Sequence, residues 1–340
     1  MDKIFDVRDD FKWTCTWYGK VIDHEVLVVS RLHRDACLKG GCGLANVLCV
    51  LASARSEGYT AALLDSVVDG IRSVKGVGVE VVKITDYLPI SPCMSCWNCA
   101  RNDEHMCTLD DSMGRRGKGE LIQKVLEANA LFIAQPVYFT RPPAATQLFF
   151  ERLYPFMWSG ELNGLPFASL SQAANNGGTR MADREMSKWA FTRSFRYIGG
   201  LPVHMVQYED AQIRARYLGR KLAEAALEDA EERRGVTALD KYLGTDGNPW
   251  SPLEVYIDDL TNGTFSYQGS LIEYALSHGT VKKEDAVDLL QKAGEELKLV
   301  LHHYRLGDRM KATEHMIKMR TFWSPATLTE FLDDDLQLGK

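Results

Sequence analysis

The chain has 340 residues, which suggests about two domains, and its 45% hydrophobic and 25% charged residues are typical of a globular protein rather than a disordered one. Its formal net charge of −6 argues against nucleic acid or an anionic membrane surface as the main partner. The apolar runs Val47–Ala52 and Ala130–Ala134 are too short to span a bilayer. No secretory signal opens the sequence, so we expect a cytoplasmic protein.

Residues 1–44 predict an N-terminal extension. Phe11, Trp13 and Trp17 alternate with polar residues, which is the period of a half-buried strand, and a second extended run follows at residues 25–30. We therefore expect a β-hairpin arm. Its aromatic face needs cover from the same chain or from a partner subunit.

Residues 45–230 predict an α/β domain, because strand patterns alternate with helix patterns. The expected strands are Val47–Ala52, Val79–Ile84, Ala130–Gln135, Phe167–Gln172 and Val203–Tyr208. The expected helices include residues 63–71, 121–126, 182–197 and 211–228. Right-handed crossovers then place helices on both faces of a parallel, doubly wound sheet.

Residues 235–340 predict a small helical domain. Ser251–Glu254 is a good helix start, with Ser at the cap and Pro at the first helical position. Apolar residues recur at helical spacing between Ala286 and Tyr304, and Thr327–Glu330 has the pattern of another capping box.

The loop of residues 52–60 lies between the first predicted strand and its helix, where α/β sheets bind phosphate at a helix N-terminus. Hydroxyl groups, one Arg and one Gly suit an anion there. Neither a nucleotide-triphosphate loop nor a G-x-G-x-x-G fingerprint is present. The alternative is a plain strand–helix turn rich in hydroxyls.

This loop resembles the S-x-R-x-x-G-N-T phosphate loop of the flavodoxin-like NADPH-dependent FMN reductase family, with Tyr59 at the usual Asn position. Residues 130–139, ALFIAQPVYF, are similar to the family's third strand and flavin loop, and Glu151-Arg152 stands where the family usually has Asp-Arg. The resemblance covers about residues 45–225. It implies a five-stranded sheet of order 2-1-3-4-5 with FMN at the carboxyl edge.

The resemblance also implies three groups of cofactor-binding residues. The FMN phosphate would be held by Ser53, Arg55, Ser56, Gly58, Tyr59 and Thr60. The isoalloxazine ring would be bordered on one side by Pro136, Val137, Tyr138 and Phe139, and on the other by Asn175, Asn176, Gly177 and Gly178. The alternatives are a proline turn with packed aromatics and an ordinary Asn-Gly-Gly turn.

The cysteine-rich insert, residues 92–111, contains the pattern C-x2-C-x2-C-x7-C formed by Cys93, Cys96, Cys99 and Cys107. In a reducing compartment, clustered cysteines favour metal binding or redox chemistry over disulfides. Four thiolates suffice for a [4Fe–4S] cluster. Free thiols near the flavin, zinc or a transient disulfide are the alternatives. The insert, with its C-x-x-D-D end, also resembles the iron–sulfur flavoproteins of the same family.

These patterns favour an FMN-dependent oxidoreductase that transfers electrons between a [4Fe–4S] cluster and FMN. No acid–base or nucleophile–base constellation identifies catalytic residues, as expected when a cofactor performs the chemistry. One alternative is a metal-free NAD(P)H-dependent FMN or quinone reductase, and another is a non-catalytic electron carrier or docking module. We expect a homo-oligomer, a dimer or a tetramer, and consider NAD(P)H or a ferredoxin-like protein as electron donor.

Overall fold

The computed structural model describes residues 44–174, 177–243 and 249–331. The described residues all belong to the second of the chain's two compact units, which begins at Leu44. The predicted β-hairpin arm lies outside the described residues, apart from Leu44. None of the helices within the described ranges combines the length and apolarity that a membrane span requires.

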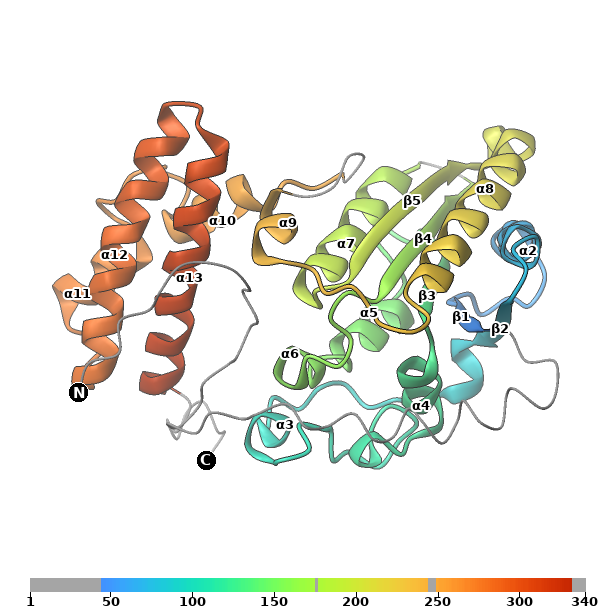
Figure 1. Cartoon of the computed structure of the whole chain (residues 1–340), viewed down its shortest axis with the longest axis horizontal. Coiled ribbons are helices and arrows are strands. Elements are labelled where there is room, and N and C mark those ends of the chain that lie inside the picture. Colours follow the sequence, from blue (N-terminus) through green and yellow to red (C-terminus); the bar gives the residue numbers. More distant parts are fainter. Residues whose placement is uncertain (1–43, 175–176, 244–248, 332–340) are drawn as a thin grey trace. The chain divides into compact units, whose positions relative to one another are not determined.

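Five parallel strands form one sheet of order β2-β1-β3-β4-β5 (Figure 1). In chain order they are β1 Ala45–Leu51, β2 Val77–Lys83, β3 Ala130–Pro136, β4 Pro166–Ala173 and β5 Arg196–His204. The strand order reverses between β1 and β3, which is where doubly wound sheets bind ligands at their carboxyl edge. The predicted α/β class and flavodoxin-like topology are therefore confirmed.

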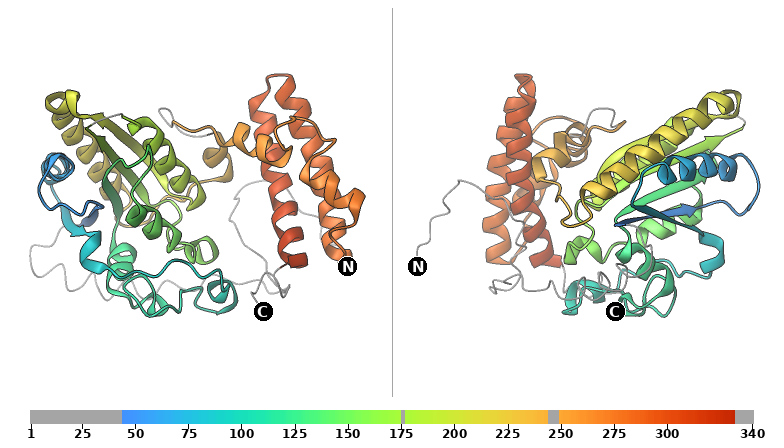
Figure 2. Two further views of the ribbon diagram at one scale, coloured as in Figure 1. Left: turned by 180° about the vertical axis from the view of Figure 1, so that it is seen from behind. Right: turned by 45° about the vertical axis from the view of Figure 1, so that its right-hand side comes forward.

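Helices cover both faces of the sheet, as the views of Figure 2 show. One layer contains α2 Tyr59–Arg72 and α8 Tyr208–Glu228, and the other contains α4 Glu120–Glu127, α5 Ala144–Glu151 and α7 Thr179–Thr192. Successive residues of β1 point to opposite faces of the sheet. Cys49 therefore packs into the core between the sheet and helices α2 and α8, whereas Leu48 packs into the core between the sheet and helices α4, α5 and α7. Because both faces of the sheet are buried, β1 and β3 contain the continuous apolar runs Val47–Leu51 and Ala130–Ala134.

The fifth strand is the one that the sequence analysis misplaced. β5 is Arg196–His204, whereas residues 205–207 form a 3₁₀ turn and Tyr208 begins α8. The predicted helix of residues 182–197 correspondingly ends at Thr192. The sequence pattern does not reveal this strand, because Gly199, Gly200 and Pro202 all have low strand propensity. They are tolerated because β5 is an edge strand.

Short helical segments occupy the connections. They are η1 Ile84–Tyr87, α3 Asn98–Arg101, η2 Arg115–Gly117, α6 Phe156–Ser159 and η3 Met205–Gln207. The segment between η1 and α4 contains all four clustered cysteines and runs to α4 without a strand among its residues.

The described residues after 235 are helical where they have regular structure. The helices are α9 Ala238–Leu243, α10 Pro252–Leu260, α11 Leu271–His278, α12 Glu284–Arg305 and α13 Arg309–Phe331. They share a third core that includes Leu253, Leu290, Leu297 and Met316. This agrees with the predicted helical character of residues 235–340, while the domain boundary itself stays a prediction.

The two capping boxes predicted in this region have different outcomes. Ser251 and Pro252 do begin α10, although the Ser251 hydroxyl contacts the Glu254 carboxylate and makes no backbone cap. The box predicted at residues 327–330 is wrong, because these residues lie inside α13. There the Glu330 carboxylate accepts hydrogen bonds of 2.9 Å from the backbone N–H groups of Lys282 and Lys283, just before α12.

Two glycines allow α2 and α8 to pack backbone against backbone. A Cβ atom on Gly70 would lie 2.0 Å from the Arg216 carbonyl oxygen, and one on Gly219 would lie 2.1 Å from the Val67 carbonyl oxygen. No side-chain rotation can relieve such contacts, because the neighbouring atoms belong to the main chain.

We therefore predict that Gly219→Ala lowers the free energy of unfolding by about 1–3 kcal/mol, the usual cost of overpacking. Helix propensity alone would favour Ala by about 1 kcal/mol, so the two effects have opposite signs. Chemical denaturation measures the difference. Gly235→Ala is the control, since its Cβ would meet only the Asn163 amide nitrogen at 3.5 Å. A Gly219→Ala protein as stable as the wild type would contradict the close packing.

Candidate functional site

The predicted phosphate loop connects the carboxyl end of β1 to the first turn of α2. Ser53 and Thr60 are buried, each with 6% of its surface exposed, whereas Arg55, Ser56 and Tyr59 are exposed. The Arg55 backbone N–H donates to Ser53 Oγ over 3.1 Å, which shapes the turn. Gly58 precedes the helix with φ of 138°, a conformation that favours glycine. No acidic residue stands in the first turn of α2, so its positive dipole end is not neutralised there.

Gln172, at the end of β4, connects this loop to the neighbouring strands. Thr60 Oγ1 donates to Gln172 Oε1 over 3.1 Å, and the Val137 backbone N–H donates to the Gln172 carbonyl oxygen over 2.8 Å. The Gln172 Nε2 atom is buried and has no hydrogen-bond partner among the described residues. A ligand acceptor such as a phosphate or flavin oxygen would satisfy it. The residues present therefore fit the cofactor that the family resemblance implies.

The two predicted flavin loops contact each other at the same edge. After β3, Tyr138 and Arg141 exchange two backbone hydrogen bonds of 3.0 Å, and the tip residues Phe139 and Thr140 have φ of 49° and 64°. A Cβ atom on Gly178 would lie 2.7 Å from the Thr140 Cα, so glycine is required there. Phe139 is 99% exposed, and its ring packs against nothing within this chain's described residues.

The structure thus brings together the loops after β1, β3 and β4 that the sequence analysis selected. Pro136 ends β3, Val137 pairs with β4, and Gly177 precedes α7 with φ of 79°. Asn175 and Asn176 lie outside the described residues. Gln172 is a residue that the sequence analysis missed, although its position at the end of a predicted strand was a usable signal.

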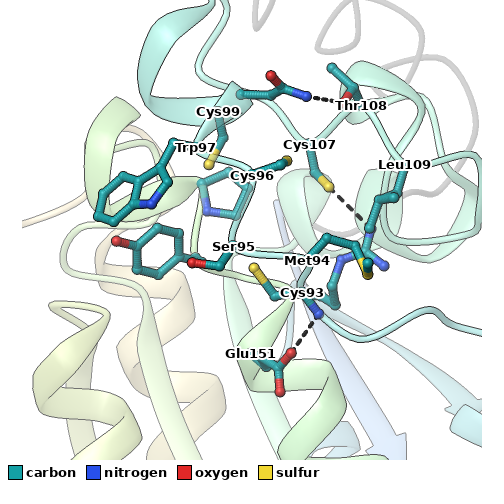
Figure 3. A pocket seen from close by; sticks show the side chains of 14 residues that line it. Cys93, Met94, Ser95, Cys96, Trp97, Cys99, Cys107, Thr108, Leu109 and Glu151 are labelled. Atoms are coloured by element: carbon teal, nitrogen blue, oxygen red, sulfur yellow. Dashed lines mark hydrogen bonds between the residues drawn. The ribbon is translucent and has the colours of Figure 1, made fainter. Parts of the chain in front are cut away.

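The four clustered cysteines line one cavity of about 180 Å³ (Figure 3). Cys93 and Cys96 are exposed, whereas Cys99 and Cys107 are half-buried, and all of them are free thiols. Burial raises the pKa of Cys99 to about 11, with further contributions from negative charge on Cys107, Cys93 and Cys96. The thiols are therefore near enough to influence one another. No group of three or more His, Cys, Asp or Glu side chains in the described residues is already arranged to hold a metal ion.

Asn102 organises the loop between the third and fourth cysteines. Its side chain accepts from the Met106 N–H over 3.1 Å and donates to the Met106 carbonyl oxygen over 2.9 Å. It also donates to the Asn98 carbonyl oxygen over 2.7 Å. These bonds fold the chain back on itself, so that Cys107 returns to the cavity despite its seven-residue separation from Cys99.

Three aromatic side chains stand together beside the cysteines. The Trp97 ring lies 6.1 Å from the Tyr154 ring and 6.0 Å from the Trp158 ring, and the last two are also 6.0 Å apart. Trp97 adopts a left-handed backbone with φ of 58°, which turns the chain at this point. Burial raises the pKa of Tyr154 to about 12. Trp97 and Tyr154 give the cavity an apolar wall next to the thiols.

A buried ion pair, Arg152–Asp111, holds the insert against the end of α5. Arg152 Nη1 lies 2.5 Å from Asp111 Oδ2, and Nη2 lies 3.0 Å from Oδ1, with 1% and 7% of the two side chains exposed. The backbone N–H groups of Ser91 and Met113 also donate to this carboxylate, each over 3.0 Å. Burial pushes the pKa of Asp111 upward, but the Arg152 and backbone hydrogen bonds outweigh it and leave the pKa lowered.

This pair was not expected from the sequence, although both residues stand in motifs quoted above. Glu151 and Arg152 were noted as a family position, and Asp111 as the end of the C-x-x-D-D tail. The residue types could have linked them. An Arg at the end of an apolar helix is rarely buried without a partner, because a buried guanidinium needs a carboxylate.

The comparisons agree with this geometry. Residues 45–209 match the family model described as NADPH-dependent FMN reductase, which confirms the predicted resemblance. An iron–sulfur flavoprotein of Methanocaldococcus jannaschii is 25% identical over 154 residues, covering 45% of this chain and 75% of the relative. An iron–sulfur flavoprotein of Archaeoglobus fulgidus is 28% identical over 210 residues, covering 57% of this chain and 90% of the relative.

Solved structures are similar at lower identity. A flavone reductase is 16% identical with a TM-score of 0.42, covering 56% of this chain and 66% of its own. An NAD(P)H:quinone oxidoreductase from Methanothermobacter marburgensis is also 16% identical, with a TM-score of 0.37 and coverages of 52% and 96%. The fold assignment rests on the strand order of this chain itself.

We predict that Asp111→Ala lowers the free energy of unfolding by about 3–5 kcal/mol at neutral pH, because it leaves the Arg152 charge buried without a partner. Asp110→Ala is the matched control. Asp110 pairs with Arg115 at the surface, with 87% and 56% of the two side chains exposed, so its loss should cost about 0–1 kcal/mol.

The same ion pair predicts a pH dependence. Since the pKa of Asp111 is lowered on folding, its contribution is complete above the ordinary value of 3.8 and is lost as pH falls through the lowered value. Denaturation curves of wild type and Asp111→Ala should therefore converge only in strong acid. A gap that closes between pH 7 and pH 5 would contradict this assignment.

Proposed function

We propose that this chain, a flavin-dependent oxidoreductase whose residues 45–209 match the NADPH-dependent FMN reductase family, transfers electrons between FMN and a [4Fe–4S] cluster. The cluster would be held by Cys93, Cys96, Cys99 and Cys107. FMN would be held at the carboxyl edge by the three loops that follow β1, β3 and β4.

The observation that carries the proposal is the shared cavity of the four cysteines. Their spacing alone does not require convergence, because a seven-residue gap could carry Cys107 away from the others. The Asn102 hydrogen bonds and the Arg152–Asp111 pair return it to the same cavity. Two relatives named as iron–sulfur flavoproteins support the same interpretation.

The two cofactors have complementary chemistry. A cluster exchanges one electron at a time, whereas a flavin exchanges one or two, so together they connect one-electron donors to two-electron acceptors. The protein supplies binding and electrostatics. Arg55 and the start of α2 would receive the phosphate, and the loop of Pro136–Phe139 and the Gly177–Gly178 turn would border the ring. Trp97 and Tyr154 would exclude water from one side of the thiols.

A metal-free NAD(P)H-dependent reductase is the second candidate. It is favoured by the finding that the described cysteines share a cavity without already forming a metal-binding group. In that case the free thiols would serve as structural or redox-sensitive groups beside the flavin. The homo-oligomer, the nicotinamide donor and the ferredoxin-like donor stay predictions.

We predict that the anaerobically reconstituted protein contains about four irons and four sulfides per chain. Replacing any one of the four cysteines by Ala should reduce the iron content to well below this value, as measured by iron and sulfide analysis with visible absorption. Cys49→Ala is the control, because Cys49 is fully buried in β1 and contacts the α2–α8 core.

Iron content that falls equally in Cys49→Ala would assign the loss to folding. A wild-type protein with a flavin spectrum and no iron after reconstitution would overturn the cluster. Rapid NADPH oxidation with free FMN or a quinone would then support the metal-free reductase.

We also predict that Arg55→Gln weakens FMN binding about tenfold or more. One hydrogen bond to a charged phosphate contributes about 1.5–3 kcal/mol, and 1.4 kcal/mol is a factor of ten in Kd. Flavin fluorescence titration of the apoprotein measures the change. Arg72→Gln, at the C-terminal end of α2 and therefore far from the phosphate loop, should bind FMN as the wild type does. Equal Kd values for wild type and Arg55→Gln would remove Arg55 from the phosphate site.

A further inference from the structure

We infer that Arg152 is a positioning residue for the fourth cysteine, orienting the Cys107 thiolate and stabilising the reduced state of the cluster. This inference rests on the proposed function, because it concerns the cluster that the four cysteines would hold. It starts from a hydrogen bond of 3.2 Å from Arg152 Nη2 to Cys107 Sγ.

The guanidinium of Arg152 donates hydrogen bonds both to the Asp111 carboxylate and to the Cys107 sulfur. Nη1 donates to Asp111 Oδ2 over 2.5 Å and to the Ser91 carbonyl oxygen over 2.7 Å. Nη2 donates to Asp111 Oδ1 over 3.0 Å and to Cys107 Sγ. The planar fork thus fixes the carboxylate with both nitrogens and still directs one donor at the sulfur. A lysine ammonium has no such planar geometry.

Main-chain atoms lie close to the Arg152 guanidinium. A Cβ atom on Gly114 would lie 3.1 Å from Arg152 Nη2 and 2.0 Å from the Leu109 carbonyl oxygen. Gly114 therefore lies near Nη2 at a position where no side chain would fit. Only 2% of the Arg152 surface is exposed, so water does not compete for the donor.

The residue before Arg152 contacts the opposite end of the cysteine motif. Glu151 Oε1 accepts a hydrogen bond of 2.5 Å from the Cys93 backbone N–H. Consecutive residues at the end of α5 thus contact the first and the last of the four cysteines. The end of α5 positions both ends of the motif relative to each other.

The electrostatic consequence follows from the charge of the sulfur. Hydrogen bonds to cluster sulfurs and nearby net charge are among the main determinants of reduction potential. Adding one electron makes the thiolate-bound group more negative, and a buried donor stabilises the more negative state more strongly than it would in water. Losing the donor should lower the midpoint potential.

The test compares Arg152→Lys with the wild type in potentiometric titrations of the reconstituted protein, followed by electron paramagnetic resonance. Lysine keeps the charge but loses the fork. We expect it to reduce the equilibrium constant for one-electron reduction about tenfold, which corresponds to about 59 mV for one electron. Arg115→Lys is the matched control, because Arg115 follows the same insert closely in the chain but pairs with exposed Asp110.

Asp111→Asn is the second variant, and it predicts the opposite direction. It removes the negative charge that faces the guanidinium, so the midpoint potential should rise, and this measurement decides if Arg152→Lys does not fold. Iron analysis on each sample identifies the cause of a failure. If the variants have full iron content and unchanged midpoint potentials, the role of Arg152 is overturned while the proposed function stands. No iron in the wild-type protein would overturn the proposed function, and this inference with it.

Discussion

The buried ion pair between Arg152 and Asp111 is the interaction on which the arrangement of the cysteine insert depends. The insert has little regular structure, so the ordinary hydrogen bonds of helices and strands do not determine its path. Instead, one guanidinium at the end of α5 contacts Ser91 before the cysteines, the last cysteine Cys107, and Asp111 after them. A buried pair contributes little net stability on average, but removing one partner is costly. The pair therefore selects one conformation of the insert more than it stabilises the whole fold.

The carboxyl edge of the sheet is built on a different physical basis. There the main chain forms most of the candidate site, through free N–H groups at the start of α2 and through glycines that let loops approach each other. Gln172 joins the loops after β1 and β3, because its side-chain amide accepts from Thr60 and its backbone carbonyl accepts from Val137. One side of the molecule thus offers donors suited to phosphate and flavin, and the insert offers thiols.

Much of the architecture could be predicted because β1 and β3 contain continuous apolar runs and the loops carry recognisable motifs. The prediction failed at β5, where Gly199, Gly200 and Pro202 occupy an edge strand whose position only the completed sheet defines. It also failed at residues 327–330, since the Glu330 carboxylate satisfies N–H groups nearly fifty residues earlier in the chain. The four cysteines were identifiable from spacing. The role of Arg152 was not, because it depends on contacts 41 and 45 residues away along the chain.

The misplaced strand also bears on aggregation. An exposed sheet edge offers unpaired N–H and C=O groups to which a strand of another molecule can add. At β5 the edge is interrupted by Pro202, which has no N–H to donate, and by two glycines that give a pairing strand no side chain to pack against. At the opposite edge, β2 carries Glu80 and Lys83. Within the described part of the chain, both margins of the sheet thus discourage edge-to-edge addition.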